Sequence, residues 1–255
     1  MSRPVVLEVR GLLKRYGGVT AVDGVDFTLH ENEVLGVIGP NGSGKTTLVN
    51  LITGFVKPDR GKVLYRGKRI SGLPPYRVAL KGVARTFQMA KPFYQLPAYK
   101  NLVVPLSSPR VHALAGGSYG DRDAVAKDLL EEVGFERDSW VINKAAASLP
   151  HGYLKRLELA RCMALRADLM LLDELFSGLS LAEVASMVPV IDKLRSRGKT
   201  IIMVEHRLRE LFRIADRVLV LNFGQKIAEG TPGQVMDLPA VREAYLGSEA
   251  EVGDA

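Results

Sequence analysis

GPNGSGKTT, which runs from Gly39 to Thr47, is the stretch that decides the fold. It fits the pattern Gly-x4-Gly-Lys-Ser/Thr, and it lies between the apolar run VLGVI (34–38) and the helical pattern KTTLVNLIT (45–53). Its glycines allow the backbone to turn N–H groups toward phosphate oxygens, and the positive end of the following helix attracts the same anion. The stretch therefore predicts a phosphate-binding loop between a strand and a helix.

Two side chains of this loop have chemistry of their own. Lys45 adds a full positive charge for the outer phosphates of a nucleotide, and Thr46 offers a hydroxyl to Mg²⁺. We expect the whole loop to contact the nucleotide through Gly39, Pro40, Asn41, Gly42, Ser43, Gly44, Lys45, Thr46 and Thr47.

Short apolar runs along the chain predict the strands of a mostly parallel sheet. Most lack strict alternation, which is typical of strands buried on both faces, and helical patterns separate several of them. These runs are 34–38, 82–87, 169–172, 200–204 and 217–221. The stretches VLEVRGL, GVDFTLH and GKVLYRGKRI alternate apolar with polar residues and predict antiparallel strands.

Residues 89–147 differ from the rest of the chain. KPFYQLPAYKNLVVPLSSPR holds four prolines and three aromatic residues, and the helical pattern DAVAKDLLEEVGF follows. We interpret this segment as an inserted, mainly helical subdomain. Further along, Ser180 and Glu183 have the spacing of a capping box at a helix start, and Pro189 predicts a kink or a looser join inside that helix.

Composition narrows the class of protein. The chain has 255 residues, 47% of them hydrophobic and 25% charged, which is ordinary for a globular protein. The formal net charge of +7 comes from positive residues spread along the chain, so we expect no nucleic-acid partner. The apolar runs are far shorter than the ~20 residues of a membrane span. Cys162, the single cysteine, lies in an amphipathic pattern that favours a buried thiol over a nucleophile.

Acidic and imidazole side chains follow two of the predicted strands. LMLLDE places Asp173 at the carboxyl end of its strand, where ligands of parallel sheets bind, and there it would hold Mg²⁺. Glu174 is the natural general base for an attacking water. His206 ends the strand in IIMVEH; such a histidine is usually structural, but here it is a candidate for a γ-phosphate contact.

SLPHGYLKRLELARCMALRADLMLLDE (148–174) predicts a helix that starts a short distance before the acidic pair. Pro150 suits the first helical position because the amide N–H there has no helical partner. Gly152 lies in the first turn, where an exposed helix N-terminus attracts anions.

Together these pieces resemble the nucleotide-binding subunit of ABC transporters, from about Leu7 to Gly247. The resemblance implies an α/β fold, with a RecA-like P-loop ATPase core, an antiparallel β subdomain and a helical insertion. It places a single ABC ATPase domain over 1–255, with the core at 1–88 and 148–255 and the helical subdomain at 89–147. In this family two subunits enclose ATP between the phosphate loop of one and the signature helix of the other.

The resemblance also assigns roles that the residues alone leave open. Tyr16 matches the aromatic residue that stacks on adenine, although a core tyrosine is an equally good interpretation. Gln88 matches the glutamine that senses Mg²⁺ and the attacking water. The catalytic residues would then be Glu174, His206 and Gln88, and the metal site would use Thr46, Gln88 and Asp173.

The signature departs from the usual Leu-Ser-Gly-Gly-Gln of the family. It aligns with Leu149–Tyr153, so the serine is replaced by Pro150 and the glutamine by Tyr153. The half-site offered to the partner's ATP would then depend on Gly152, the helix dipole and His151.

Three stretches, GVARTFQ, LKRLELARCMAL and the tail VLNFGQKIAEGTPGQVMDLPAVREAYLG, most resemble the ATP-binding subunits of branched-chain amino acid importers. The resemblance implies two transmembrane permeases docked near 88–104, a second ABC ATPase (the same chain or a related one) and an extracytoplasmic solute-binding protein. It also implies a peripheral position on the cytoplasmic face of the cell membrane, and a cargo that is a branched-chain amino acid or a related small polar solute. Alternatives are a homodimeric ATPase of a lipopolysaccharide-type exporter, and a soluble ABC ATPase outside transport, which the single phosphate loop disfavours.

Overall fold

The computed structural model describes residues 3–115, 120–137 and 139–250, which form two compact units. The first unit is built from the described parts of Met1–Pro75 and Thr200–Ala255, and the second unit is Tyr76–Lys199. Within the described residues, no helix is long and apolar enough to span a membrane.

The first unit contains a buried sheet around β3 (Val34–Ile38). β8 (Thr200–Val204) and β9 (Arg217–Asn222) flank β3 in parallel, and β10 (Gln225–Gly230) pairs antiparallel with β9. Every residue of β3 and β8 is buried, as expected for apolar strands without alternation. α8 (Leu208–Ile214) approaches β3 closely at Gly36, where a Cβ atom would lie 3.1 Å from the Leu211 side chain.

The first unit also contains further helices and a second, antiparallel sheet. Its strands have the order β2-β1-β4-β5, and the three stretches predicted to be antiparallel all belong to it. The bounds are β1 Val5–Tyr16, β2 Val19–His30, β4 Arg60–Tyr65 and β5 Lys68–Arg69; the helices are α1 (Lys45–Ile52), α9 (Pro232–Met236) and α10 (Pro239–Ala250).

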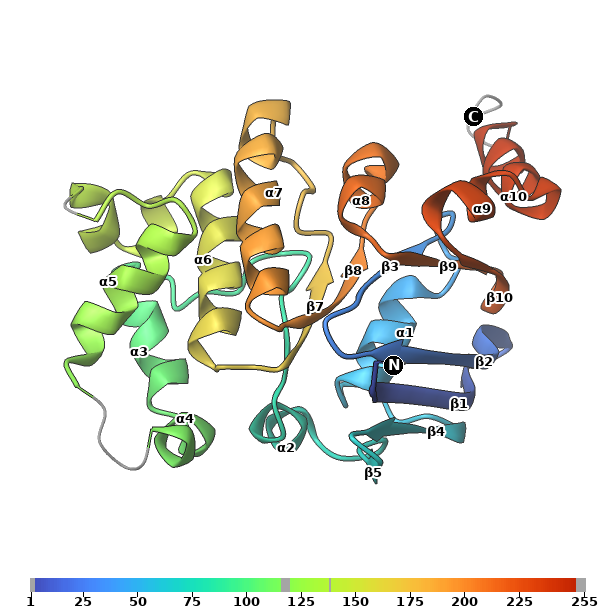
Figure 1. Cartoon of the computed structure of the whole chain (residues 1–255), viewed down its shortest axis with the longest axis horizontal. Coiled ribbons are helices and arrows are strands. Elements are labelled where there is room, and N and C mark those ends of the chain that lie inside the picture. The colour runs from blue at the N-terminus through green and yellow to red at the C-terminus, as the bar shows by residue number, and fades with distance from the viewer. Residues whose placement is uncertain (1–2, 116–119, 138, 251–255) are drawn as a thin grey trace. The chain divides into compact units, whose positions relative to one another are not determined.

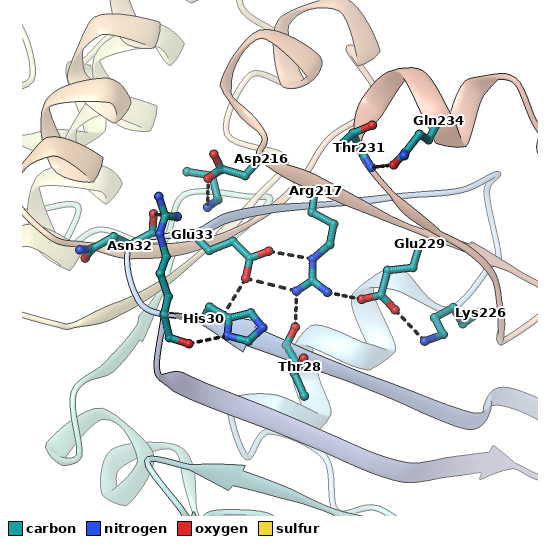
Figure 2. A network of polar contacts seen from close by, with 12 residues as sticks. Thr28, His30, Asn32, Glu33, Asp216, Arg217, Lys226, Glu229, Thr231 and Gln234 are labelled. Atoms are coloured by element: carbon teal, nitrogen blue, oxygen red, sulfur yellow. Dashed lines mark hydrogen bonds and ion pairs between the residues drawn. The ribbon is translucent and has the colours of Figure 1, made fainter. Parts of the chain in front are cut away.

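A partly buried polar network connects β2, β9, β10 and the turn before β3 (Figure 2). Arg217 lies at its centre and donates to Glu33 Oε1 at 2.7 Å, to the Thr28 carbonyl at 2.5 Å and to Glu229. Glu33 also accepts from the His30 amide at 2.7 Å. Because Glu33 is almost fully buried, the guanidinium compensates a charge that water does not reach.

The second unit combines two parallel strands, β6 (Val83–Arg85) and β7 (Leu169–Asp173), with most of the helices. α3 (Lys100–Leu106), α5 (Arg122–Glu132) and α6 (His151–Ala164) pack against one another (Figure 1). The other elements are α2 (Pro75–Leu80), α4 (Pro109–Leu114), α7 (Leu181–Ser196) and short 3-10 turns at Trp140–Asn143 and Ala146–Ser148.

Local sequence signals have mixed outcomes in this unit. The predicted capping box is confirmed: Ser180 N donates to Glu183 Oε2 at 2.8 Å, and Glu183 N donates to Ser180 Oγ at 3.3 Å. α7 continues as one helix through Pro189, so of the two predicted alternatives the looser join is wrong, and the kink stays a prediction. Pro150, the predicted first helical residue, is the N-cap of α6, so the helix begins one position later, at His151. The predicted boundaries of a helical subdomain at 89–147 stay a prediction.

Candidate functional site

The phosphate loop of the first unit depends on glycines at two close approaches. Gly39 has φ 151°, and a Cβ atom there would lie 2.1 Å from the Leu221 carbonyl oxygen. Gly44, the N-cap of α1, has φ 100°, and its Cβ would lie 2.2 Å from the Ala21 carbonyl oxygen. Any larger residue would push the loop away from β2 and β9, so the motif glycines serve packing as well as phosphate approach.

Lys45 and Ser43 present polar groups within this loop. The buried Lys45 ammonium donates to the Gly39 carbonyl at 2.7 Å and to the Pro40 carbonyl at 2.8 Å, so it spans the start of the loop. Ser43 Oγ is buried and, among the described residues, has no hydrogen-bond partner. A buried hydroxyl without a partner is costly, and a phosphate oxygen would satisfy it. Thr46 is exposed in the first turn of α1, where its hydroxyl is open to a ligand.

The C-terminal helix reaches the same loop. Burial raises the pKa of the Tyr245 phenol to about 12, and a hydrogen bond with the Gly39 backbone opposes that rise. A cavity of about 470 Å³ has residues of both the loop and α10 in its lining; the lining residues are Pro40, Asn41, Gly42, Ser43, Asn222, Phe223, Ile227, Ala240, Glu243 and Ala244. The segment that follows β10 is therefore part of the surroundings of the phosphate loop.

Tyr16 and His206 are the other predicted site residues of the first unit. Tyr16 ends β1, pairs with Val19 across the turn, and has 47% of its surface exposed. An exposed ring is accessible for stacking, and the core-tyrosine interpretation is wrong. Lys14 Nζ lies 5.4 Å from the ring centroid. His206 is exposed, two residues beyond the end of β8.

In the second unit, Asp173 ends β7 in an ion pair. Arg85 Nη2 donates to Asp173 Oδ2 at 2.9 Å, and both side chains are buried. Burial raises the pKa of Asp173 against the opposing charge of Arg85, and burial also lowers the pKa of Arg85. The other carboxylate oxygen, Oδ1, is buried without a hydrogen-bond partner among the described residues.

Glu174 follows in a backbone conformation that L-residues rarely adopt, with φ 48°. Its Oε2 accepts from the Gln88 side-chain amide at 2.7 Å, so the structure brings these two predicted residues together. Lys155 in α6 is 1% exposed, and its ammonium donates to the backbone carbonyls of Gln88 and Glu174, both at 2.7 Å.

The start of α6, predicted to face a partner's ATP, is held within its own unit. His151 Nε2 donates to the Ser177 carbonyl at 3.1 Å, so this imidazole contacts the loop that follows Glu174. A Cβ atom on Gly152 would lie 2.2 Å from Glu183 Oε1, so a larger residue here would displace the Glu183 side chain of the α7 capping box. Pro150 is exposed.

An apolar groove lies on the second unit, with Arg85 in its lining. It has a volume of about 320 Å³ and is lined by Arg85, Phe87, Val104, Pro105, Ser108, Glu158, Arg161, Cys162 and Leu165. Met89, Phe93 and Tyr94 expose large apolar surfaces in the same stretch of sequence. Cys162 is buried as predicted, and burial raises the pKa of its thiol.

Sequence reasoning missed three residues of this site: Arg85, Lys155 and Tyr245. Arg85 precedes the recognised Gln88 by only three positions, so its place in the strand before the motif was an available signal. Lys155 and Tyr245 carried no such signal, because their contacts join segments far apart in the chain.

Two protein-family models match this chain. The family model described as "ABC transporter" matches residues 22–177. A second model, "Branched-chain amino acid ATP-binding cassette transporter", matches residues 225–251.

Individual proteins match along nearly the whole chain. The high-affinity branched-chain amino acid transport ATP-binding protein BraF of Pseudomonas aeruginosa is 40% identical, with 97% of this chain and 99% of BraF covered. LivG of Escherichia coli (strain K12), with the same description, is 37% identical at the same coverage. The lipopolysaccharide export protein LptB of Haemophilus influenzae is 33% identical over 96% of this chain and 98% of its own.

Solved structures agree with these relatives. The ADP conformation of MJ1267, an ATP-binding cassette of an ABC transporter, has a TM-score of 0.82 at 30% identity, covering 96% of this chain and 99% of MJ1267. The predicted α/β P-loop fold is therefore confirmed.

Proposed function

The chain belongs to the ABC transporter family of ATP-binding proteins, and on that premise we propose that it is the ATP-hydrolysing subunit of a branched-chain amino acid importer. The observation that carries this conclusion is the 40% identity to BraF over 97% of the chain. The match of residues 225–251 to the branched-chain amino acid type supports the same assignment at the C-terminal segment.

We assign the nucleotide contacts to the first unit. The loop Gly39–Thr47 would surround the phosphates with its amides, and the Lys45 ammonium, now on loop carbonyls, would be close enough to exchange them for phosphate oxygens. Tyr16 would stack on the adenine ring, for which its exposed surface is suited. His206 would contact the γ-phosphate.

The second unit would supply the groups that act on water and the metal. Glu174 would take a proton from the attacking water, held in place by the Gln88 amide on its Oε2. Mg²⁺, when bound, would neutralise charge developing on the phosphates. The orphaned oxygen of Asp173 fits a water-mediated contact to that ion, and the hydroxyl of Thr46 and the amide oxygen of Gln88 suit its preference for oxygen ligands.

We further propose the partners and the position in the cell. Two transmembrane permeases would bind on the second unit at the apolar groove and the exposed residues around Met89, because these combine apolar surface with the charge of Arg161. A second ABC ATPase would use the α6 half-site, and a solute-binding protein outside the membrane would deliver the amino acid. This assigns the chain to the cytoplasmic face of the cell membrane.

The test is uptake of radiolabelled leucine by cells that lack this chain and are complemented with the parent or Glu174→Gln. We expect the parent to restore uptake, and Glu174→Gln to leave it at the level of the deletion while the purified variant still binds ATP. Restored uptake by Glu174→Gln would contradict the role of Glu174. Unchanged uptake in the deletion strain would contradict the cargo and favour the LptB-like alternative.

A further inference from the structure

Lys155 has an unusual environment for a lysine. It is 1% exposed and ranks among the largest fully buried side chains of the described residues. Burial of an ammonium is costly unless hydrogen bonds compensate for lost water, and Lys155 makes two such bonds, each 2.7 Å long. Its two acceptors are the backbone carbonyls of Gln88 and Glu174, which belong to the two residues proposed to hold and activate water.

One of these two hydrogen bonds is made to Glu174, which has a left-handed backbone conformation. Glu174 is one of five non-glycine residues with positive φ among those described, and this conformation is costly for a residue with a Cβ atom. The left-handed turn fixes the direction in which the Glu174 side chain leaves the backbone. A carbonyl held by a buried cation resists the rotation that would relax the turn.

Gln88 is joined to Glu174 twice. Its side-chain amide donates to Glu174 Oε2 at 2.7 Å, and its backbone carbonyl shares the Lys155 ammonium with the Glu174 carbonyl. The segment that leaves the sheet at Gln88 and the turn at Glu174 are therefore fixed to one point on α6, the helix that also carries the signature residues at its start.

We propose that Lys155 is a positioning residue for Glu174: its buried ammonium locks the left-handed turn and holds the Gln88 and Glu174 backbones together, so that the carboxylate faces the attacking water. Lys155 touches neither water nor nucleotide in this role. The inference rests on the proposed function, because it requires Glu174 to be the base.

The test is steady-state ATP hydrolysis by the transporter assembled with its permeases, with parallel measurements of MgATP affinity and melting temperature. Lys155→Met keeps the length of the side chain and removes its donors, and we expect kcat to fall by about 10- to 100-fold with KM for ATP within about threefold. Lys155→Arg keeps a cation with several donors and should retain most of kcat.

Arg156→Met is the matched control on the same helix. Arg156 also donates to a backbone carbonyl, that of Val133, and to Ser186 Oγ at 2.5 Å, so these hydrogen bonds involve neither Gln88 nor Glu174. This variant should melt at a lower temperature and keep kcat within about twofold, since it loses structural contacts only. If Lys155→Met does not fold, Lys155→Gln, which keeps an amide donor, replaces it in every comparison.

A double variant separates positioning from general destabilisation. In the Glu174→Gln background there is no base to position, so adding Lys155→Met should leave the residual single-turnover rate unchanged. A further fall equal to that in the parent, or a kcat of Lys155→Met within twofold of the parent, would overturn the proposal. A parent-like rate in Glu174→Gln alone would instead refute the proposed function.

Discussion

Lys45 illustrates, at the scale of one residue, how a side chain can serve both the free loop and the ligand. Its ammonium already lies on the carbonyls of Gly39 and Pro40, so it is held near the place where the outer phosphates would bind. Little side-chain freedom then remains to be lost when a phosphate replaces those carbonyls.

Replacing Lys45 with alanine should weaken ATP binding by about 10- to 100-fold, because a charge-assisted hydrogen bond contributes about 1.5–3 kcal/mol. Isothermal titration with MgATP measures this, and Lys68→Ala, an exposed lysine of β5, is the control. Unchanged affinity in Lys45→Ala would contradict the assignment of the loop.

Tyr245 predicts an alkaline effect on stability. An ordinary tyrosine loses its proton near pH 10, whereas Tyr245 in the folded chain holds it to about pH 12. Between these values the unfolded chain binds fewer protons, so the folded state loses stability as pH rises from about 10 to 12. Tyr245→Phe should make this decline in stability shallower when denaturant unfolding is repeated across this pH range. Tyr76→Phe is the control and should decline as the parent does. A decline in Tyr245→Phe equal to that of the parent would contradict the burial of the phenol.

At this scale, motif residues could be predicted and their contacts could not. The phosphate loop and the Asp173-Glu174 pair follow from local patterns, because strand, turn and carboxylate are neighbours in the sequence. The contacts of Lys155 and Tyr245 depend on how distant segments pack, and a lysine within LKRLELARC gives no local sign of being buried. His151 was expected at a partner's ATP, and its bond to Ser177 is visible only in the folded unit.

At the scale of elements, the polar network around Arg217 contributes to the stability of the first unit. Arg217→Ala would leave Glu33 buried without its ion pair, and we expect a loss of about 3 kcal/mol in the free energy of unfolding. Urea denaturation of the variant measures it. Arg10→Ala removes an exposed pair with Glu8 and should barely change the free energy of unfolding, because water screens that pair. Equal losses in the two variants would show that Arg217 acts as a surface residue.

The apolar groove of the second unit predicts where the permeases bind. Val104 is 50% exposed and lines the groove, so Val104→Asp should barely change melting but should reduce copurification of the permeases by about tenfold. Leu114→Asp, on an α4 residue that is 53% exposed and lies outside the groove lining, should leave copurification intact. Normal recovery of the complex with Val104→Asp would place the permeases elsewhere.

Helices and strands were predicted well where their signals are local. The capping box at Ser180 and the strand at Val34–Ile38 appear as expected, because each is set by neighbouring residues. Pro189 did not interrupt α7, since packing of the buried residues on either side, Met187 and Ile191, maintains the helix across the lost hydrogen bond.

At the scale of the whole molecule, the chain divides its proposed chemistry between two units. The phosphate loop, Tyr16 and His206 belong to the first unit, and Gln88, Asp173 and Glu174 belong to the second. Sequence reasoning placed Asp173, Glu174 and His206 from their positions after predicted strands, whereas Tyr16 and Gln88 were assigned only through resemblance to a family.

Self-association tests how the altered signature works. We expect purified Glu174→Gln chain to stay monomeric in light scattering with MgATP, because Pro150 removes the serine hydroxyl from the half-site that a second copy would offer. Adding a related ATPase with an unaltered signature should then produce a dimer. A dimer of Glu174→Gln alone would contradict this expectation and would favour the homodimeric alternative.

The buried thiol of Cys162 has a practical consequence for following these events. It is the single cysteine of the chain, and its raised pKa keeps it protonated and inert toward maleimides. A cysteine placed at Met89, which is 74% exposed, would therefore take up a fluorophore selectively without prior removal of the native thiol. The labelled chain, unchanged at every other position, would then report binding of the permeases by a change in fluorescence emission.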